Sequence, residues 1–198
     1  MAFASTPRLI PTPVDTRGRY AFTVADYHQL IVSGHFTRAD RIELISGELT
    51  IMPPIGPEHS AHTTRITNTL PAELPAGVWL RMNELITIPD HSEPQPDAAI
   101  VRARADGYRK AHPGPKDVLL VIEVADSSVE FDLKVKAKLY SKAGIPEYWM
   151  VDVPECQVQV FTGASARGYK NVKVFERGDV LKCGSVKGLS LKVTELLA

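Results

Sequence analysis

The stretch Val118-Leu119-Leu120-Val121-Ile122-Glu123-Val124 is the most apolar run of the chain, and it decides the fold. A continuous apolar run of this length is typical of a strand that is buried on both faces of a sheet. Glu123 places a carboxylate inside this run, and a carboxylate is rarely buried without a partner. The sequence therefore predicts a central strand whose acidic side chain meets a cation.

A helix with two misplaced charges is expected after this strand, over residues 128–143. With a rotation of roughly 100° per residue, one arc of this helix is apolar: Val129, Leu133, Val135, Leu139, Tyr140 and Ala143. The opposite side carries the basic residues Lys134, Lys138 and Lys142. Asp132 and Lys136, four residues apart, point inward with the apolar set. A buried ammonium costs several kcal/mol unless it is paired, so we expect an anion beneath Lys136.

The remaining pattern predicts an α/β fold. Helices are expected at residues 24–32, capped by Thr23, and at residues 58–74, with a hairpin over residues 41–52 that turns at Ser46-Gly47. Strands are expected at residues 78–82, 84–88, 97–101 and 148–153, followed by antiparallel strands after Val158 and a short terminal helix. The result is a mixed β-sheet flanked by helices, with appended β-hairpins.

Length and composition favour one soluble domain. The chain has 198 residues, and we expect a flexible N-terminal arm at residues 1–20 before a single domain at residues 21–198. No apolar stretch is long enough to cross a bilayer, and the first residues lack the layout of a secretory signal. The two cysteines, Cys156 and Cys183, are therefore expected to be reduced thiols, and the expected location is cytoplasmic.

Charge is balanced, with 23 basic and 23 acidic side chains, which argues against a strongly basic nucleic-acid-binding surface. A local basic patch is nevertheless expected in the polar loop at residues 102–116. Arg102, Arg104 and Lys110 are its candidate nucleic-acid contacts, although such runs are more often solvated loops.

Asp97 and Glu123 suggest metal chemistry. Asp97 opens the strand that precedes the apolar run, and Pro96 before it favours extended backbone. If the two strands are neighbours, the two carboxylates approach each other, and a divalent cation would relieve their repulsion. Oxygen ligands without a Cys or His cluster indicate Mg²⁺ or Mn²⁺ rather than Zn²⁺. With Lys136 on the following helix, the set has what metal-assisted phosphodiester hydrolysis needs.

The same residues carry a family resemblance. Pro96-Asp97, Glu123 and a later lysine resemble the PD-(D/E)XK nuclease superfamily, which has the restriction-endonuclease fold. More closely, the chain resembles the bacterial Uma-two family of restriction endonuclease-like proteins. The stretches that match are DRIELISGE at 40–48, PIGPEH at 54–59, SEPQPD at 92–97, VIEVADSS at 121–128 and GIPEYW at 144–149.

The resemblance implies a metal-dependent endonuclease that acts on nucleic acid, with DNA as the expected substrate and a homodimer as a possible assembly. It implies that Asp97, Glu123 and Glu43 bind the metal and that Lys136 is catalytic. His59 lies in a matching stretch and is a supporting candidate. The superfamily usually places its lysine two residues after the second acid, where this chain has Ala125, so Lys136 would be a relocated lysine.

Other interpretations of these residues stay open. Glu123 could pair with a buried base, Asp97 could cap a turn, and Lys136 could extend to the surface along its methylene groups. Glu43 could pair with Arg41, and Asp132 is a supporting anchor for Lys136 rather than a metal ligand. For the whole chain, the alternatives are a non-catalytic nucleic-acid- or protein-binding module that keeps the nuclease fold, and a hydrolase of a smaller phosphoester.

Overall fold

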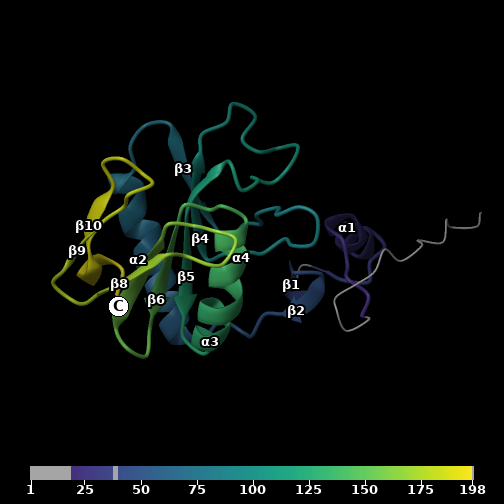
Figure 1. Cartoon of the computed structure of the whole chain (residues 1–198), viewed down its shortest axis with the longest axis horizontal. Helices are drawn as coiled ribbons and strands as arrows, with labels where there is room; N and C mark the ends of the chain where they lie inside the picture. The colour runs from purple at the N-terminus through teal and green to yellow at the C-terminus, as the bar shows by residue number, and fades with distance from the viewer. Residues whose placement is uncertain (1–18, 38–39, 198) are drawn as a thin grey trace, which may run out of the picture.

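A six-stranded mixed sheet forms the centre of the molecule, whose computed structural model describes residues 19–37 and 40–197 (Figure 1). Its strands run in the order β3 (Val78–Met82), β4 (Ala98–Arg102), β5 (Val118–Ala125), β6 (Glu147–Asp152), β7 (Gln157–Thr162) and β8 (Asn171–Phe175). The β5–β6 pair is parallel and the other pairs are antiparallel. The predicted mixed α/β sheet is confirmed. The arm predicted at residues 1–20 lies, except for its last two residues, outside the described residues.

Strand β5 is the centre of the core, because all eight of its residues are buried. Its parallel neighbour β6 can be reached only by a crossover, and the chain makes this crossover with a helix. That helix has three parts: α3 (Val129–Phe131), the π-helical turn η2 (Asp132–Lys136) and α4 (Ala137–Lys142). We call the three parts together the crossover helix.

The two faces of the sheet are covered by different elements. The crossover helix covers one face, where Tyr140 packs with Val121 in one cluster of buried side chains. Helix α2 (Pro57–Glu73) covers the other face, where Ile66 packs with Ile122. The C-terminal elements β9 (Val180–Lys182), β10 (Ser190–Lys192) and η3 (Val193–Glu195) lie beside α2 (Figure 1). No helix in the described ranges is long and apolar enough to cross a membrane.

The crossover helix buries the two predicted charges. Asp132 is 2% exposed and Lys136 is 7% exposed. Val135, however, was predicted on the buried arc and is 36% exposed, so that prediction is wrong. The reason is the π turn, which holds an extra residue per turn and so rotates each of its residues by less than an α-helix does. Val135 turns outward as a result, and Ala137 and Ser141 become buried.

A small lobe stands at one side of the sheet (Figure 1). It consists of α1 (Val24–Val32) and the hairpin of β1 (Ile42–Ile45) and β2 (Glu48–Ile51), as predicted. Thr23 caps α1, and its side chain accepts from the Asp26 N–H. The lobe is joined to the loop before β4 by backbone hydrogen bonds, from the Glu93 N–H to the Leu44 carbonyl and from the Gly47 N–H to the His91 carbonyl, both 2.7 Å. This loop leads directly to Asp97, so the lobe and the start of β4 are held together.

The strand predicted at residues 84–88 is wrong, and only Ile88 makes an isolated bridge, to Ser92. The backbone donors of this segment bond to loops rather than to a strand. The Ile86 N–H donates to the Pro94 carbonyl and the Thr87 N–H to the Pro113 carbonyl, both at 3.0 Å.

We expect Gly47→Ala to destabilise the protein more than Gly77→Ala. Both glycines have positive φ, 83° and 86°, so both substitutions carry the same backbone cost, about 1–2 kcal/mol. A Cβ on Gly47 would lie 2.8 Å from the Ala21 Cβ, whereas one on Gly77 would meet nothing within 4 Å. Urea unfolding of the two variants measures the difference. Equal losses of stability would show that the hairpin turn is not held against residue 21.

Candidate active site

The predicted acids Asp97 and Glu123 lie side by side because of strand register. In the β4–β5 pair Ala98 lies opposite Ile122, so Asp97, just before β4, lies opposite Glu123. The Asp97 N–H points to Glu123 Oε2 at 3.4 Å. The Glu123 side chain is on the face of the sheet that the crossover helix covers, because residues alternate between faces along a strand and Val121 is on that face.

Lys136 meets three carboxylates from different parts of the chain. Its Nζ lies 3.0 Å from Glu123 Oε1 and 3.3 Å from Glu43 Oε1. Asp132, one turn earlier in the crossover helix, is more distant, with its Oδ1 3.9 Å from the same Nζ. Gln95 also holds Glu43 in place, since its N–H donates to Glu43 Oε1 at 2.8 Å. The anion expected beneath Lys136 is therefore a group of carboxylates.

Electrostatics inside the cluster favour a permanently charged lysine. Burial alone would lower the pKa of Lys136, but the carboxylates of Glu123 and Glu43 outweigh it, so this pKa lies above that of an ordinary lysine. Burial raises the pKa of Glu123 well above its usual value, despite the opposing charge of Lys136. Burial likewise raises the pKa of Asp132. The cluster thus holds more acid than its ammonium can neutralise.

Tyr140 belongs to the same cluster, although its position in the helical pattern predicted a place in the apolar arc. Its hydroxyl donates to Glu123 Oε1 at 2.6 Å, and the residue is fully buried. The sequence already indicated that Tyr140 lies near Lys136, because it follows Lys136 by four residues on the inward side of the helix. Tyr140 and Lys136 share one oxygen of Glu123, which leaves Oε2 facing Asp97.

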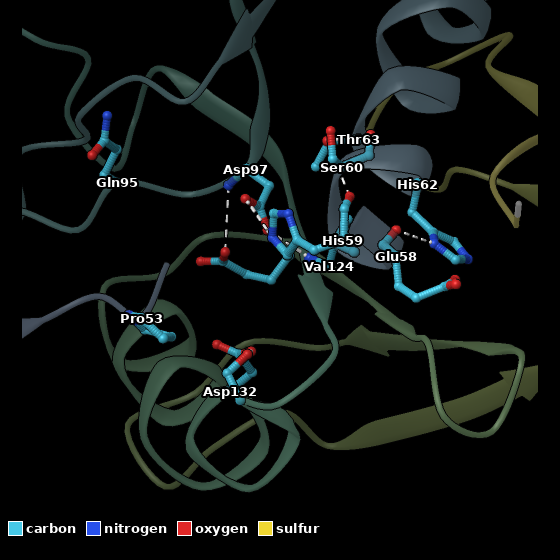
Figure 2. A network of polar contacts seen from close by, with 12 residues as sticks. Pro53, Glu58, His59, Ser60, His62, Thr63, Gln95, Asp97, Val124 and Asp132 are labelled. Carbon is cyan, nitrogen blue, oxygen red and sulfur yellow. Dashed lines mark hydrogen bonds and ion pairs between the residues drawn. The ribbon is translucent and has the colours of Figure 1, made fainter. Parts of the chain in front are cut away.

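His59 reaches Asp97 from the first turn of α2 (Figure 2). Its Nε2 is hydrogen-bonded to Asp97 Oδ2 at 3.2 Å, and this hydrogen bond raises the pKa of His59. On the other side, the Val124 N–H donates to Asp97 Oδ2 at 2.8 Å. The Asp97 carboxylate is thus oriented by both the helix and the central strand, while Asp132 lies apart from this pair on the crossover helix (Figure 2).

A cavity of about 530 Å³ opens onto this cluster. All the predicted central residues line it, namely Asp97, Glu123, Glu43, Lys136, Asp132 and His59. Its outer wall is the end of the hairpin together with the segment that leads to α2, and it includes Ile51, Pro53 and Ile55. The carboxylates therefore form the floor of an open site rather than a sealed core.

The comparisons with known proteins agree with this architecture. Residues 24–194 match the model of the Uma2 family, which is described as "Putative restriction endonuclease". The chain belongs to the Uma2 family. This confirms the resemblance drawn from the five sequence stretches, and the match spans nearly all of the described residues.

A solved structure has the same fold as this Uma2 chain. It is the crystal structure of "a putative nuclease belonging to DUF820" from Anabaena variabilis, with a TM-score of 0.67 and 17% sequence identity. The match covers 88% of this chain and 97% of the other. At this identity the likeness establishes the fold alone. Among functionally curated proteins, none matches the chain.

The predicted basic contacts are not part of the cavity in this Uma2 protein. Arg102 is at the opposite end of β4 from Asp97. Arg104 pairs with Asp106 at 2.5 Å, and its guanidinium lies 4.0 Å from the centre of the Tyr108 ring. Neither arginine lines the cavity, nor does Lys110. The guanidinium that does line it belongs to Arg41, for which the sequence suggested only a pairing with Glu43.

The donor set of the Uma2 cavity fits a hard divalent cation. Across residues 19–37 and 40–197, no three His, Cys, Asp or Glu side chains are grouped as a ready-made metal site. Mg²⁺ does not need such a group, because it is usually bound through one or two carboxylates and keeps several waters. Asp97 and Glu123 could supply two carboxylates on adjacent strands, whereas one oxygen of Glu43 is already shared by Lys136 and Gln95.

We expect Tyr140→Phe to destabilise the protein by about 1–3 kcal/mol, because a buried carboxylate loses a hydrogen bond. Tyr148→Phe is the matched control. Tyr148 is also fully buried and its ring lies 5.4 Å from that of Tyr140, but within the described part of the chain its hydroxyl has no partner. Its removal should be neutral or stabilising. Urea unfolding compares the two, and equal effects would contradict the role assigned to the Tyr140 hydroxyl.

Proposed function

We propose that this protein is a nuclease that hydrolyses phosphodiester bonds with Mg²⁺ or Mn²⁺, and that DNA is its substrate. The observation that supports this most directly is the meeting of Asp97, Glu123 and Lys136 in one open cavity. Two carboxylates and a charged amine at the floor of a concave site suit the transfer of an anionic phosphoryl group. Membership of the Uma2 family points to the same activity.

In this proposal, Asp97 and Glu123 hold the metal, and Glu43 adds a third acid at its edge. When bound, the cation would polarise the scissile phosphate and make a neighbouring water more acidic. The Val124 N–H and His59 orient Asp97, and the Tyr140 hydroxyl orients Glu123. These contacts keep both carboxylates in position before the substrate arrives.

Lys136 would orient the attacking water and stabilise the negative charge that develops on the phosphate. It keeps its proton, because the surrounding carboxylates favour the ammonium form. Two of its three donors are directed to Glu123 and Glu43, at 3.0 and 3.3 Å, so the third is available to the water. Asp132 Oδ1, at 3.9 Å, lies beyond hydrogen-bond distance. In this proposal Asp132 supports the charge of the lysine rather than binding the metal.

The homodimer and the cytoplasmic location stay predictions. One feature supports a homodimer through the sheet: β8 is an edge strand, and its Val172 and Val174 are 53% and 51% exposed. An exposed edge strand with apolar side chains can pair with a second copy of the chain.

A second candidate function has an observation in its favour. The ammonium of Lys136 already faces three carboxylates. A non-catalytic module that binds nucleic acid or protein on the same scaffold would show this pairing. In that protein Lys136 would be a permanent counter-ion of the acids.

Metal binding separates the two candidates. We expect calorimetric titration with Mn²⁺ or Mg²⁺ to give a binding heat, and Asp97→Asn to weaken the binding by about tenfold or more. Glu155→Gln is the control, because it removes an exposed carboxylate outside the cavity. Absence of binding, or equal binding by both variants, would favour the non-catalytic module.

Cleavage tests the nuclease directly. With Mg²⁺, the wild-type protein should cut supercoiled plasmid or single-stranded DNA, and Glu123→Gln and Lys136→Met should each lower the rate by about 100-fold or more. Lys138→Ala is the control, because Lys138 is exposed on the outer side of the same helix.

Folding must be checked for Lys136→Met, because removing one partner of a buried ion pair costs about 3–5 kcal/mol. Circular dichroism and thermal melting serve this purpose. Glu123→Gln keeps an oxygen for the Tyr140 hydroxyl, so it is the variant with the smaller structural effect. Equal rates for folded wild type, Glu123→Gln and Lys138→Ala would end the nuclease proposal.

A further inference from the structure

One cation at the active-site cavity has no acidic partner. Among the described residues that line the cavity, Arg41 and Lys136 carry the permanent positive charges. The ammonium of Lys136 is paired with Glu123 and Glu43. The Arg41 guanidinium forms no ion pair within the described part of the chain, and its hydrogen bond goes to the neutral Pro53 carbonyl at 2.9 Å. Its charge is therefore available to an anion from outside.

The guanidinium of Arg41 is held with one edge free. A guanidinium carries five N–H donors in a planar fork. Nη1 is engaged with the Pro53 carbonyl, while Nε and Nη2 have no hydrogen-bond partner among the residues that the structure describes. Such a pair of nitrogens can bind two oxygens of a phosphate in parallel. The Pro53 contact thus orients the group and leaves open the edge that suits an oxyanion.

The backbone of Arg41 is also unusual. Its φ is 43°, in the left-handed region that residues with a Cβ rarely adopt. The Met52 N–H donates to the Arg41 carbonyl at 2.8 Å, and the next residue, Ile42, pairs with Ile51 in the hairpin. Strained backbone that is held by surrounding contacts is concentrated at binding and catalytic sites. The strain at a residue that lines the cavity therefore supports a role in binding.

The charge of the cavity gives this cation a task. The acids of the lining outnumber its cations, so a polyanionic substrate meets a negative surface unless a cation lies on its path. These acids are Glu43, Asp97, Glu123, Asp126 and Asp132. The Lys136 side chain is only 8% exposed, whereas Arg41 is partly exposed. The arginine therefore lies nearer to solvent, where a backbone phosphate arrives first.

We propose that Arg41 binds a phosphate of the nucleic-acid backbone at the mouth of the cavity, next to the phosphate that is cut at the floor. This inference rests on the proposed nuclease function and adds a substrate-binding residue to it. Because the bound phosphate does not react, Arg41 stabilises substrate and transition state equally, and its loss raises KM without lowering kcat. The contact involves no base, so it is made by single strands and by duplexes alike.

The test measures the salt dependence of binding, because each phosphate contact contributes a known slope. Fluorescence anisotropy follows a labelled oligonucleotide between about 50 and 200 mM salt. Ca²⁺ replaces Mg²⁺, since it also takes oxygen ligands but in a looser geometry, and a denaturing gel shows that the oligonucleotide stays intact. Steady-state cleavage with Mg²⁺ gives kcat and KM, and thermal melting checks folding.

The proteins compared are wild type, Arg41→Gln, Arg41→Lys and Arg102→Gln. Arg102 is the matched control, because its guanidinium also donates to one backbone carbonyl, that of Lys116 at 3.3 Å, and it lies outside the cavity. Arg41→Lys keeps the charge but loses the two-pronged edge. A residue that only supports the hairpin through Pro53 would not change the salt slope.

We expect Arg41→Gln to weaken binding about tenfold and to reduce the slope of log K against log salt by about 0.7–0.9, the value of one phosphate contact. Arg41→Lys should keep the slope and lose only part of the affinity, while Arg102→Gln changes neither. In cleavage, Arg41→Gln should raise KM about tenfold and leave kcat within about twofold of wild type.

An unchanged slope for Arg41→Gln, or an equal change for Arg102→Gln, overturns the inference and leaves the nuclease function intact. A fall in kcat at constant KM also overturns it, because Arg41 would then act on the reacting phosphate. If Arg41→Gln does not fold, wild-type affinity of Arg41→Lys has the same meaning. Absence of cleavage by wild type, with the slope still dependent on Arg41, instead overturns the nuclease function and leaves the phosphate site standing. Absence of wild-type binding overturns both.

Discussion

The charge pairing around Lys136 is the constraint on which the rest of the site depends. One ammonium faces carboxylates from the hairpin, from the central strand and from its own helix. Because a buried cation cannot lose its anions without a large cost, and the anions cannot lose the cation, none of these parts can move alone. The ion cluster thus joins the small lobe, which carries Glu43, to the sheet, which carries Glu123. The open cavity exists because this junction sets the distance between them.

Much of this arrangement could be predicted from particular residues. A helical rotation was enough to place Lys136 and Asp132 inward, since a charge inside an apolar arc is a strong signal. The apolar run around Glu123 predicted a buried central strand for the same reason. The prediction that Asp97 lies close to Glu123 depended on β4 and β5 being neighbouring strands. The strand register shows that they are neighbours. The metal and the roles of individual acids remain proposals.

Other features depend on contacts that no local pattern contains. The outward turn of Val135 results from a π turn. The prediction assumed a constant rotation of an α-helix, which does not include such a turn. The extended segment at residues 84–88 resembled a strand, but its backbone donors are taken by loops. Arg41 and Arg102 are both arginines beside strands, and only the three-dimensional path of the chain decides that Arg41 lines the cavity. The cluster of basic residues in the sequence had instead favoured the loop at residues 102–116 as the place of the nucleic-acid contacts.

The π turn also bears on how this protein can change over evolution. Such a turn corresponds to one additional residue inside an otherwise regular helix, and its slower rotation offsets the added residue. Deleting a residue from the turn would therefore restore regular α-helix while Tyr140 keeps nearly the same facing toward Glu123. Descendants of this chain are free to exchange the outward lysines, and a change of one residue in the length of this turn is also compatible with the tyrosine contact.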